Sequence, residues 1–392
     1  MTSNRNVRKA LAVLSALMLA VCAAPACAEG AGEAALTDMR LELGGSSIAY
    51  PALAGMADET LQQEINRRMQ ENLDVDGYLE RMTALISEET QRVRITWDGA
   101  VAGDVLSCVL SAEGALETSR NTHRWTWANI DLRDGHEITF DELFTDGEAA
   151  RAALEEYLEN EVAPELSAHL NSSELTPLPE GFRLEQAGIT LLYPLDRLST
   201  LGDRAGDVRI GWNEIRDELN LEEDGIPDRI GVTEMITLTD ESGDRIRAMA
   251  ESGSLPGIPV RIGDGLKALT DRYHLLIDPD VFEGGRLFSL EGGCFRDVFL
   301  MTDYLSEKWD SSTVQGIRMD RGCAWGLCIG QTCREEWREV LGEPEYAVTL
   351  DEDMAEARRR EPGDCDYYRF GAYQLQLYTD AGGTLVSITL TE

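Results

Sequence analysis

The sequence is poor in basic residues and in histidine. Its 392 residues include 35 lysines and arginines against 72 aspartates and glutamates, and only four histidines. A negative charge this large excludes a general affinity for nucleic acids or anionic membrane surfaces, because both repel it. It favours cationic partners or metal ions, and it is equally typical of a well-solvated surface.

The short motifs of the large enzyme classes are also absent. No histidine lies in an H-E-x-x-H pattern, and the chain has no G-x-S-x-G elbow, P-loop or dinucleotide fingerprint. Carboxylate pairs are too frequent in such an acidic chain to identify a glycosidase dyad. We therefore predict a protein that is not an enzyme and that needs no cofactor, with calcium as the one exception considered below.

Long apolar runs are missing beyond the N-terminus. Arg5, Arg8 and Lys9 precede an apolar stretch over residues 10–24, and small residues at 26–28 offer a cleavage site. This pattern predicts a signal peptide over residues 1–28, too short for a membrane span, followed by a linker over 29–35. Export places the remaining chain outside the cytoplasm, secreted, periplasmic or envelope-associated, and lipidation at Cys22 or Cys27 is the alternative.

Removal of the signal peptide takes away three basic and no acidic residues, so the net charge falls from −37 to −40. It also leaves six cysteines, and an even number in an oxidising compartment indicates disulfides. For Cys108, in the run V-L-S-C-V-L, a small buried hydrophobe is an alternative role. The disulfide candidates are Cys108, Cys294, Cys323, Cys328, Cys333 and Cys365.

The hydrophobic periodicity is typical of an α+β fold, an antiparallel sheet packed by helices. Leu61, Ile65, Met69 and Leu73 recur every four residues as on a helix. Alternating residues over 93–97, ending at Asp98-Gly99, precede a second strand over 105–110 and predict a hairpin. We expect this first domain to cover residues 36–219 and an acidic linker to cover 220–250.

The second domain, residues 251–392, contains a weak internal repeat. In each copy, about 251–319 and 320–392, an Ile-Gly pair precedes a helical stretch that is followed by alternating strands. This arrangement resembles the repeats of β-lactamase-inhibitor-like proteins, and the resemblance implies a surface that grips an enzyme.

The central stretch, residues 121–144, combines a strand, an Asp134-Gly135 turn and a short return strand. Its run Asp131-Leu132 … Gly135 … Ile138-Thr139-Phe140-Asp141-Glu142-Leu143-Phe144 resembles the extracytoplasmic domain shared by the deacetylase PdaC and the anti-sigma factor RsiV. The resemblance covers about residues 36–219. It implies ligands of the cell envelope, because RsiV-like domains recognise lysozyme.

Two sets of residues are candidate sites. His123, Trp125, Trp127 and Asn129 share one strand face and form an exposed partner-binding stripe if the opposite face meets the helices; a bulge that buries them is the alternative. The oxygen-bearing residues Asn220, Glu222, Asp224 and Asp228, with Gly225 between them, have the spacing of a calcium loop. A solvated turn is the alternative for this second set.

These features together predict an exported binding or sensing protein of the cell envelope. Its partner is expected to be a cationic protein, such as lysozyme or another hydrolase, attracted by the negative surface. One alternative is a cell-wall hydrolase that uses dispersed carboxylates. Another is a lipid-anchored structural protein of envelope assembly.

Overall fold

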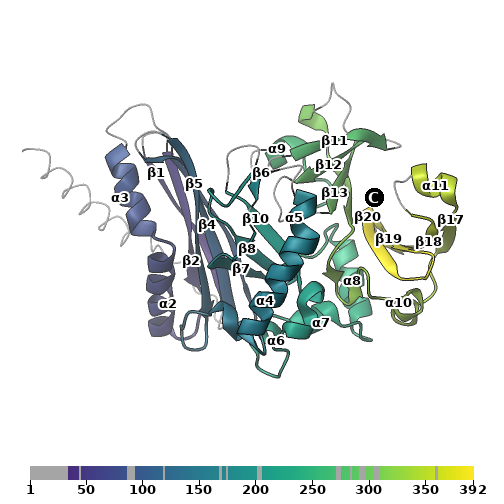
Figure 1. Cartoon of the computed structure of the whole chain (residues 1–392), viewed down its shortest axis with the longest axis horizontal. Coiled ribbons are helices and arrows are strands. Elements are labelled where there is room, and N and C mark those ends of the chain that lie inside the picture. Colours follow the sequence, from purple (N-terminus) through teal and green to yellow (C-terminus); the bar gives the residue numbers. More distant parts are fainter. Residues whose placement is uncertain are drawn as a thin grey trace, which may run out of the picture.

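The computed structural model describes residues 34–43, 46–85, 93–117, 120–166, 170–173, 175–200, 205–270, 275–282, 285–290, 297–303, 309–357 and 361–392. The predicted signal peptide, Cys22, Cys27 and Cys294 lie outside them. The fold is α+β, as predicted, and its antiparallel sheets are packed by helices and follow one another along the long axis of the molecule (Figure 1).

The first sheet has five strands in the order of the chain: β1 (Ala35–Leu43), β2 (Ser46–Ala54), β3 (Val93–Ala102), β4 (Val105–Glu117) and β5 (Arg120–Asp131). All neighbours are antiparallel except β2 and β3. A parallel pair needs a crossover, and α2 (Glu59–Asn72) and α3 (Val75–Leu85) supply it. The predicted β3–β4 hairpin turns at Gly103-Asp104, so Asp98-Gly99 lies inside the strand and the predicted turn position was wrong.

The first sheet is covered on both faces. Ile65, Met69 and Leu73 pack with Leu106 and Ile130 on the helix side. The other face of β4 and β5 meets a three-stranded sheet whose order is β10–β8–β7. Its strands are β7 (Gly181–Glu185), β8 (Gly188–Leu192) and β10 (Asp207–Gly211), next to the small pair β6 (Leu170–Ser173) and β9 (Leu198–Thr200).

Helical segments share the core of this central sheet. The longest is α4 (Gly147–Tyr157), which continues through the π-turn η2 (Leu158–Val162) into α5 (Ala163–Leu166). Two 3-10 turns, η1 (Phe140–Leu143) and η3 (Trp212–Glu218), complete the layer. Leu154, Leu158 and Val162 are buried from this layer, as helical spacing requires.

The segment predicted to be an acidic linker, residues 220–250, is folded into the molecule. It forms α6 (Ile226–Arg229), α7 (Val232–Ile236) and α8 (Ser242–Glu251, ending just beyond it). Met235 and Ile236 join the core of the central sheet, whereas Ile246 joins the core of the following sheet. Between its many acidic residues, a few apolar side chains pack into the core of the central sheet or into the core of the eight-stranded sheet.

The third sheet has eight antiparallel strands in the order β11–β12–β13–β14–β20–β19–β18–β17. The strands of the two predicted repeats meet in it, where β14 pairs with β20. One face packs on α8, α9 (Leu266–Thr270) and α10 (Arg334–Leu341), while α11 (Glu352–Ala357) follows β17. The strands are β11 (Leu275–Phe282), β12 (Gly285–Leu290), β13 (Val298–Thr302), β14 (Val314–Met319), β17 (Tyr346–Leu350), β18 (Gly363–Phe370), β19 (Tyr373–Thr379) and β20 (Leu385–Thr391).

A short hairpin connects the central and third sheets. Its strands are β15 (Cys323–Ala324) and β16 (Leu327–Cys328), and a disulfide joins Cys323 to Cys328. Both half-cystines are buried in the core of the central sheet, whereas Ala324 and Leu327 are buried in the core of the eight-stranded sheet. Within the described residues, no helix combines the length and apolar character that a membrane crossing needs.

Candidate functional site

The predicted partner-binding stripe on β5 is mostly inside the protein. His123 is buried, and its Nδ1 accepts a hydrogen bond of 3.1 Å from the backbone N–H of Ala205. Its Nε2 therefore carries the proton and lies 2.8 Å from the hydroxyl of Ser111. Asn129, 1% exposed, donates to the carbonyl of Phe182 at 2.9 Å.

The two tryptophans of the stripe are half-buried. The ring of Trp125 stands edge-on to His123 with centroids 4.4 Å apart. The ring of Trp127 lies against Gly181 of β7, where an added Cβ would come within 2.8 Å of it. The register of β4 with β5 is unbroken from Thr122 to Asp131, so the cover comes from β7 and not from a bulge. The exposed stripe was thus a wrong prediction, and so was the bulge proposed to bury it.

The predicted calcium residues are turned to protein partners. Asp224 lies 3.0 Å from Arg133 in an ion pair, and Asp228 accepts a hydrogen bond from Thr233 at 3.2 Å. The side chain of Asn220 accepts from the backbone N–H of Glu222 at 3.3 Å. In the described part of the chain, the carboxylates of this loop form no group of three or more whose oxygens all lie within 4.8 Å of one another. This loop is a turn held in place by an ion pair and by hydrogen bonds to neighbouring residues.

The cysteines differ in their surroundings. Cys323 and Cys328 form the disulfide described above. Cys108 is a buried thiol in β4, as in the alternative that made it a small hydrophobe, and burial raises its pKa to about 12. Cys333 is an exposed thiol just before α10, and Cys365 is buried in β18. The disulfide prediction was therefore wrong for Cys108 and Cys333.

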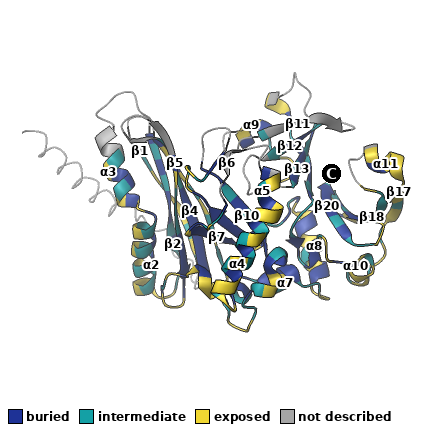
Figure 2. Cartoon of the chain, viewed as in Figure 1, coloured by how far each residue is buried: buried dark blue, intermediate teal, exposed yellow. Residues whose placement is uncertain are grey.

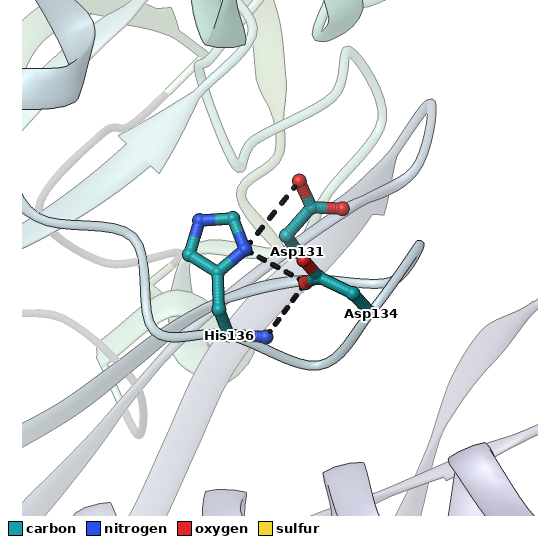
Figure 3. Close-up of side chains that lie close together, drawn as sticks. All are labelled: Asp131, Asp134 and His136. Carbon is teal, nitrogen blue, oxygen red and sulfur yellow. Dashed lines mark hydrogen bonds and ion pairs between the residues drawn. The ribbon is translucent and has the colours of Figure 1, made fainter.

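The turn that follows β5 brings together Asp131, Asp134 and His136, with ligand atoms within 4.8 Å of one another (Figure 3). The Nδ1 of His136 lies 2.7 Å from Asp134 and 3.9 Å from Asp131, and its Nε2 lies 3.0 Å from Glu142. The hydrogen bond that the ring of His136 donates to the carboxylate of Asp134 raises the pKa of His136. We call Asp131, Asp134 and His136 the turn cluster.

The turn cluster is tied to arginines from distant segments. Arg229 of α6 donates to both oxygens of Asp131 at 2.7 Å and also contacts Asp104, which in turn pairs with Arg133. Burial alone would raise the pKa of Asp131, but the hydrogen bonds of Arg229 and of a backbone N–H lower it. The sequence gives no sign of this partner, because Arg229 lies 98 residues further along the chain.

The chemistry of the turn cluster is that of a clamp. Both ring nitrogens of His136 already lie beside carboxylates, and both oxygens of Asp131 accept from Arg229. A divalent cation would have to displace a guanidinium that already neutralises the site. These groups therefore hold the tip of the first sheet to α6.

The eight-stranded sheet carries a different kind of surface on the face away from α8–α10. Cross-strand pairing places Tyr346, Tyr367, Gln376 and Thr389 in one row, and Gln374 and Tyr378 flank Gln376 along β19. The rings of Tyr346 and Tyr367 stack with centroids 4.3 Å apart. We call Tyr346, Tyr367, Gln374, Gln376 and Tyr378 the aromatic–amide face.

Hydrogen bonds order this face. Gln374 donates to the hydroxyl of Tyr346 at 3.2 Å, Gln376 donates to Gln374 at 3.3 Å, and Tyr378 donates to Gln376 at 3.1 Å. Tyr346 is 44% exposed and the two glutamines are half-buried, whereas Tyr367 and Tyr378 are buried in a cluster with Leu350 of β17 and Ala355 of α11. The alternation Gln374-Leu-Gln376-Leu-Tyr378 is the sequence signal for it, since the leucines point to the core.

A small polar cavity lies between the central and third sheets. Its volume is about 30 Å³, and Arg209, Glu214 and Arg321 contribute to its lining. Glu214 is bound by Tyr157 at 2.5 Å and by Arg321 at 2.8 Å. A space of this size accommodates ordered water.

Comparison with known proteins gives distant structural likeness only. No protein-family model matches the chain, and no curated protein matches it. A DUF3298 family member from Bacteroides fragilis is 14% identical, with a TM-score of 0.38, over 52% of this chain and 99% of its own. A DUF3298 family protein from Pseudomonas aeruginosa is 11% identical, with a TM-score of 0.34, over 49% of this chain and 96% of its own. The DUF4309 family protein YjgB from Bacillus subtilis is 14% identical, with a TM-score of 0.25, over 39% of this chain and 97% of its own.

Proposed function

We propose that the chain is an exported, non-catalytic binding protein that recognises a cationic protein of the cell envelope through the aromatic–amide face. The observation that carries the proposal is that face itself. It is an ordered row of tyrosines and glutamines on the side of the eight-stranded sheet opposite α8–α10, where Tyr346, Gln374 and Gln376 reach the surface and Tyr367 and Tyr378 pack beside α11.

The chemistry of the face suits recognition. Tyrosine supplies a large rigid contact area at a small cost in conformational entropy, and amide side chains supply both donors and acceptors. The hydrogen bonds from Gln376 to Gln374 and from Gln374 to Tyr346 hold these groups in place before a partner arrives. Such preorganisation lowers the entropic cost of association.

The charge of the chain supports the choice of partner. A net charge of −37 steers a cationic protein toward the molecule and raises its association rate. The N-terminal signal pattern and the Cys323–Cys328 disulfide both agree with an oxidising compartment outside the cytoplasm. The PdaC/RsiV-like pattern of the first domain and the inhibitor-like repeat of the second suggest lysozyme or a similar hydrolase as the class of partner.

The experiment is retention of hen lysozyme on the immobilised chain without residues 1–28, at low and at high salt. We expect retention that weakens with salt, and a loss of at least tenfold in affinity for the double variant Gln374→Ala/Gln376→Ala, since one or two well-placed contacts are worth about 1.4 kcal/mol or more. Thr37→Ala, on the exposed β1, is the matched control and should bind as the wild type does. No retention of lysozyme, or an unchanged affinity of the double variant, would refute the proposal.

A further inference from the structure

The two edges of the eight-stranded sheet are built differently. β11, at one edge, contains Asp278, Pro279 and Asp280, and its register with β12 shifts between Ile277 and Val281. Charges, proline and bulges are the devices that prevent an edge strand from pairing with a strand of another chain. That edge is protected.

The opposite edge, β17, has none of these devices within the strand. Its sequence Tyr-Ala-Val-Thr-Leu contains no charge and no proline, and its register with β18 is unbroken from Tyr346 to Leu350. In the described part of the chain, no strand pairs with its outer side. A row of backbone N–H and C=O groups is therefore presented at this edge.

The surroundings of β17 are apolar at two points. Tyr346 is 44% exposed and Met354 of α11 is 38% exposed; among the described residues, these are the exposed large hydrophobic side chains. Tyr346 begins β17 and Met354 lies on α11, and we call these two elements, which lie at the end of the molecule farthest from the first sheet, the β17–α11 corner (Figure 1 and Figure 2). Exposed aromatic and methionine side chains are frequent anchors of protein interfaces.

The same corner is acidic. Glu345, Glu352, Asp353 and Glu356 are exposed, and none forms an ion pair within 4.0 Å with a described residue. The stretch from Gly342 to Glu361 has seven acidic residues against three arginines. A second copy of this chain would bring two such corners together, and their repulsion opposes self-association.

We propose that the outer edge of β17 pairs with an extended, lysine- and arginine-rich strand of a protein partner. Its main chain extends the sheet, its apolar side chains contact Tyr346 and Met354, and its basic side chains face the carboxylates of α11. The inference rests on the proposed function, because it specifies how the partner of the aromatic–amide face is also held along the adjoining edge.

Two variants of one exposed position separate this mode of binding from simple attraction by charge. Ala347 is the second residue of β17, and its side chain is exposed. Ala347→Lys puts a cation in the path of a basic strand, whereas Ala347→Glu adds a side chain of similar size with the opposite charge. Unchanged melting temperatures establish that both variants fold.

The probes are hen lysozyme and a ten-residue peptide that alternates Lys and Val, with a Pro-interrupted peptide of the same charge as control. We expect Ala347→Lys to weaken binding of both probes at least tenfold and Ala347→Glu to preserve it. We also expect slower hydrogen exchange over residues 345–350 when either probe is bound, and no binding of the interrupted peptide.

The outcomes distinguish the two proposals. If wild-type chain retains neither probe, the proposed function itself fails. If lysozyme binds but Ala347→Lys binds it as the wild type does and residues 345–350 exchange at an unchanged rate, only the edge-pairing inference is overturned. Sedimentation that shows a dimer dispersed by Ala347→Lys would also overturn it, because a second copy would then be the occupant of the edge.

Discussion

The first and third sheets of this protein are both antiparallel in most of their pairings, yet they are covered differently: other elements cover both faces of the first sheet, whereas among the described residues the second face of the third sheet is covered in part, by α11. The first sheet is covered by α2 and α3 on one face and by β7 on the other. Its free edge, β1, carries Asp38, Arg40 and Glu42 in its sequence. The eight-stranded sheet packs only one face on α8–α10 and ends in the uncharged β17.

The difference shows what strand alternation can and cannot predict. Alternation correctly groups His123, Trp125 and Asn129 on one face of β5. It does not reveal that β7, more than fifty residues later, will cover that face through Phe182. In the third sheet the same kind of alternation separates Leu375 and Leu377, which are buried in the core, from Gln374 and Gln376, which are half-buried on the other face.

The prediction with the largest expected effect concerns the face of the third sheet that packs on α10. The carboxylate of Asp366 is fully buried, and Arg334 and Arg338 of α10 bind it at 2.6 Å. Burial alone would raise the pKa of Asp366, but the hydrogen bonds of Arg338 and Arg334 lower it to about 2. Asp366→Ala leaves Arg338 without its acidic partner and Arg334 with Asp364 alone, and it should lower the free energy of unfolding by about 3–5 kcal/mol.

Denaturant unfolding measures this effect, with Asp353→Ala on the exposed side of α11 as the control, expected within about 0.5 kcal/mol of the wild type. Because the folded pKa of Asp366 is depressed, the stabilisation is complete above its ordinary value of 3.8 and is lost as the pH falls toward 2. A destabilisation of Asp366→Ala no larger than that of the control would show that α10 is held by its apolar contacts alone.

The second prediction compares a buried residue of β5 with a residue of the aromatic–amide face. Asn129→Ala removes the hydrogen bonds to Phe182 and Ser107 inside the first sheet and should cost about 1–3 kcal/mol of stability, because it leaves buried polar groups without partners. Gln376→Ala on the aromatic–amide face should cost less than Asn129→Ala, about 1 kcal/mol, because Gln376 is only half-buried although the buried Tyr378 loses its acceptor. Retention of lysozyme should show the reverse order, with Asn129→Ala binding normally and Gln376→Ala weakly.

Two outcomes of the same assays would contradict this difference between Asn129 and Gln376. A folded Asn129→Ala variant that no longer retains lysozyme would place the binding surface on the first sheet. A Gln376→Ala variant destabilised as much as Asn129→Ala would make the aromatic–amide face a structural element.

The smallest effect concerns the turn cluster at the tip of the first sheet. Its partners Asp134 and Glu142 raise the pKa of His136 above its ordinary value of 6.5. A raised pKa means that the imidazolium is favoured by folding, so its contribution is complete below pH 6.5 and is lost as the pH rises through the folded pKa. Since His136 is 40% exposed, solvent screening limits this contribution to less than about 1 kcal/mol.

His136→Gln should therefore be less stable than the wild type at pH 5.5 and nearly equal to it at pH 9, as measured by urea midpoints. Glu137→Gln, an exposed neighbour, is the control and should show no such dependence. A stability difference that grows with pH would mean that His136 is neutral in the folded protein.

Local signals in the sequence predicted much of the fold. The four-residue spacing that ends at Leu73 gave α2, the alternation over 93–97 gave β3, and Asp134-Gly135 gave a turn in which Gly135 has φ +77°. Each of these depends on neighbours within a few residues. The α+β class followed from the succession of such elements.

The features that the sequence did not reveal depend on distant partners. The clamp of the turn cluster needs Arg229, and the burial of Asp366 needs two arginines from α10. The pairing of Cys323 with Cys328 was one among the combinations that six cysteines allow. Residues 220–250 have the composition of a linker, and only their packing on two cores shows their role.

The β15–β16 hairpin has a consequence for work with fragments of this protein. Its half-cystines fill one core and its Ala324 and Leu327 fill the other, so any cut between residues 250 and 320 leaves an unfilled hole in whichever half lacks the hairpin. Truncated versions should accordingly express poorly or aggregate, because the two halves complete each other's cores and form one folding unit.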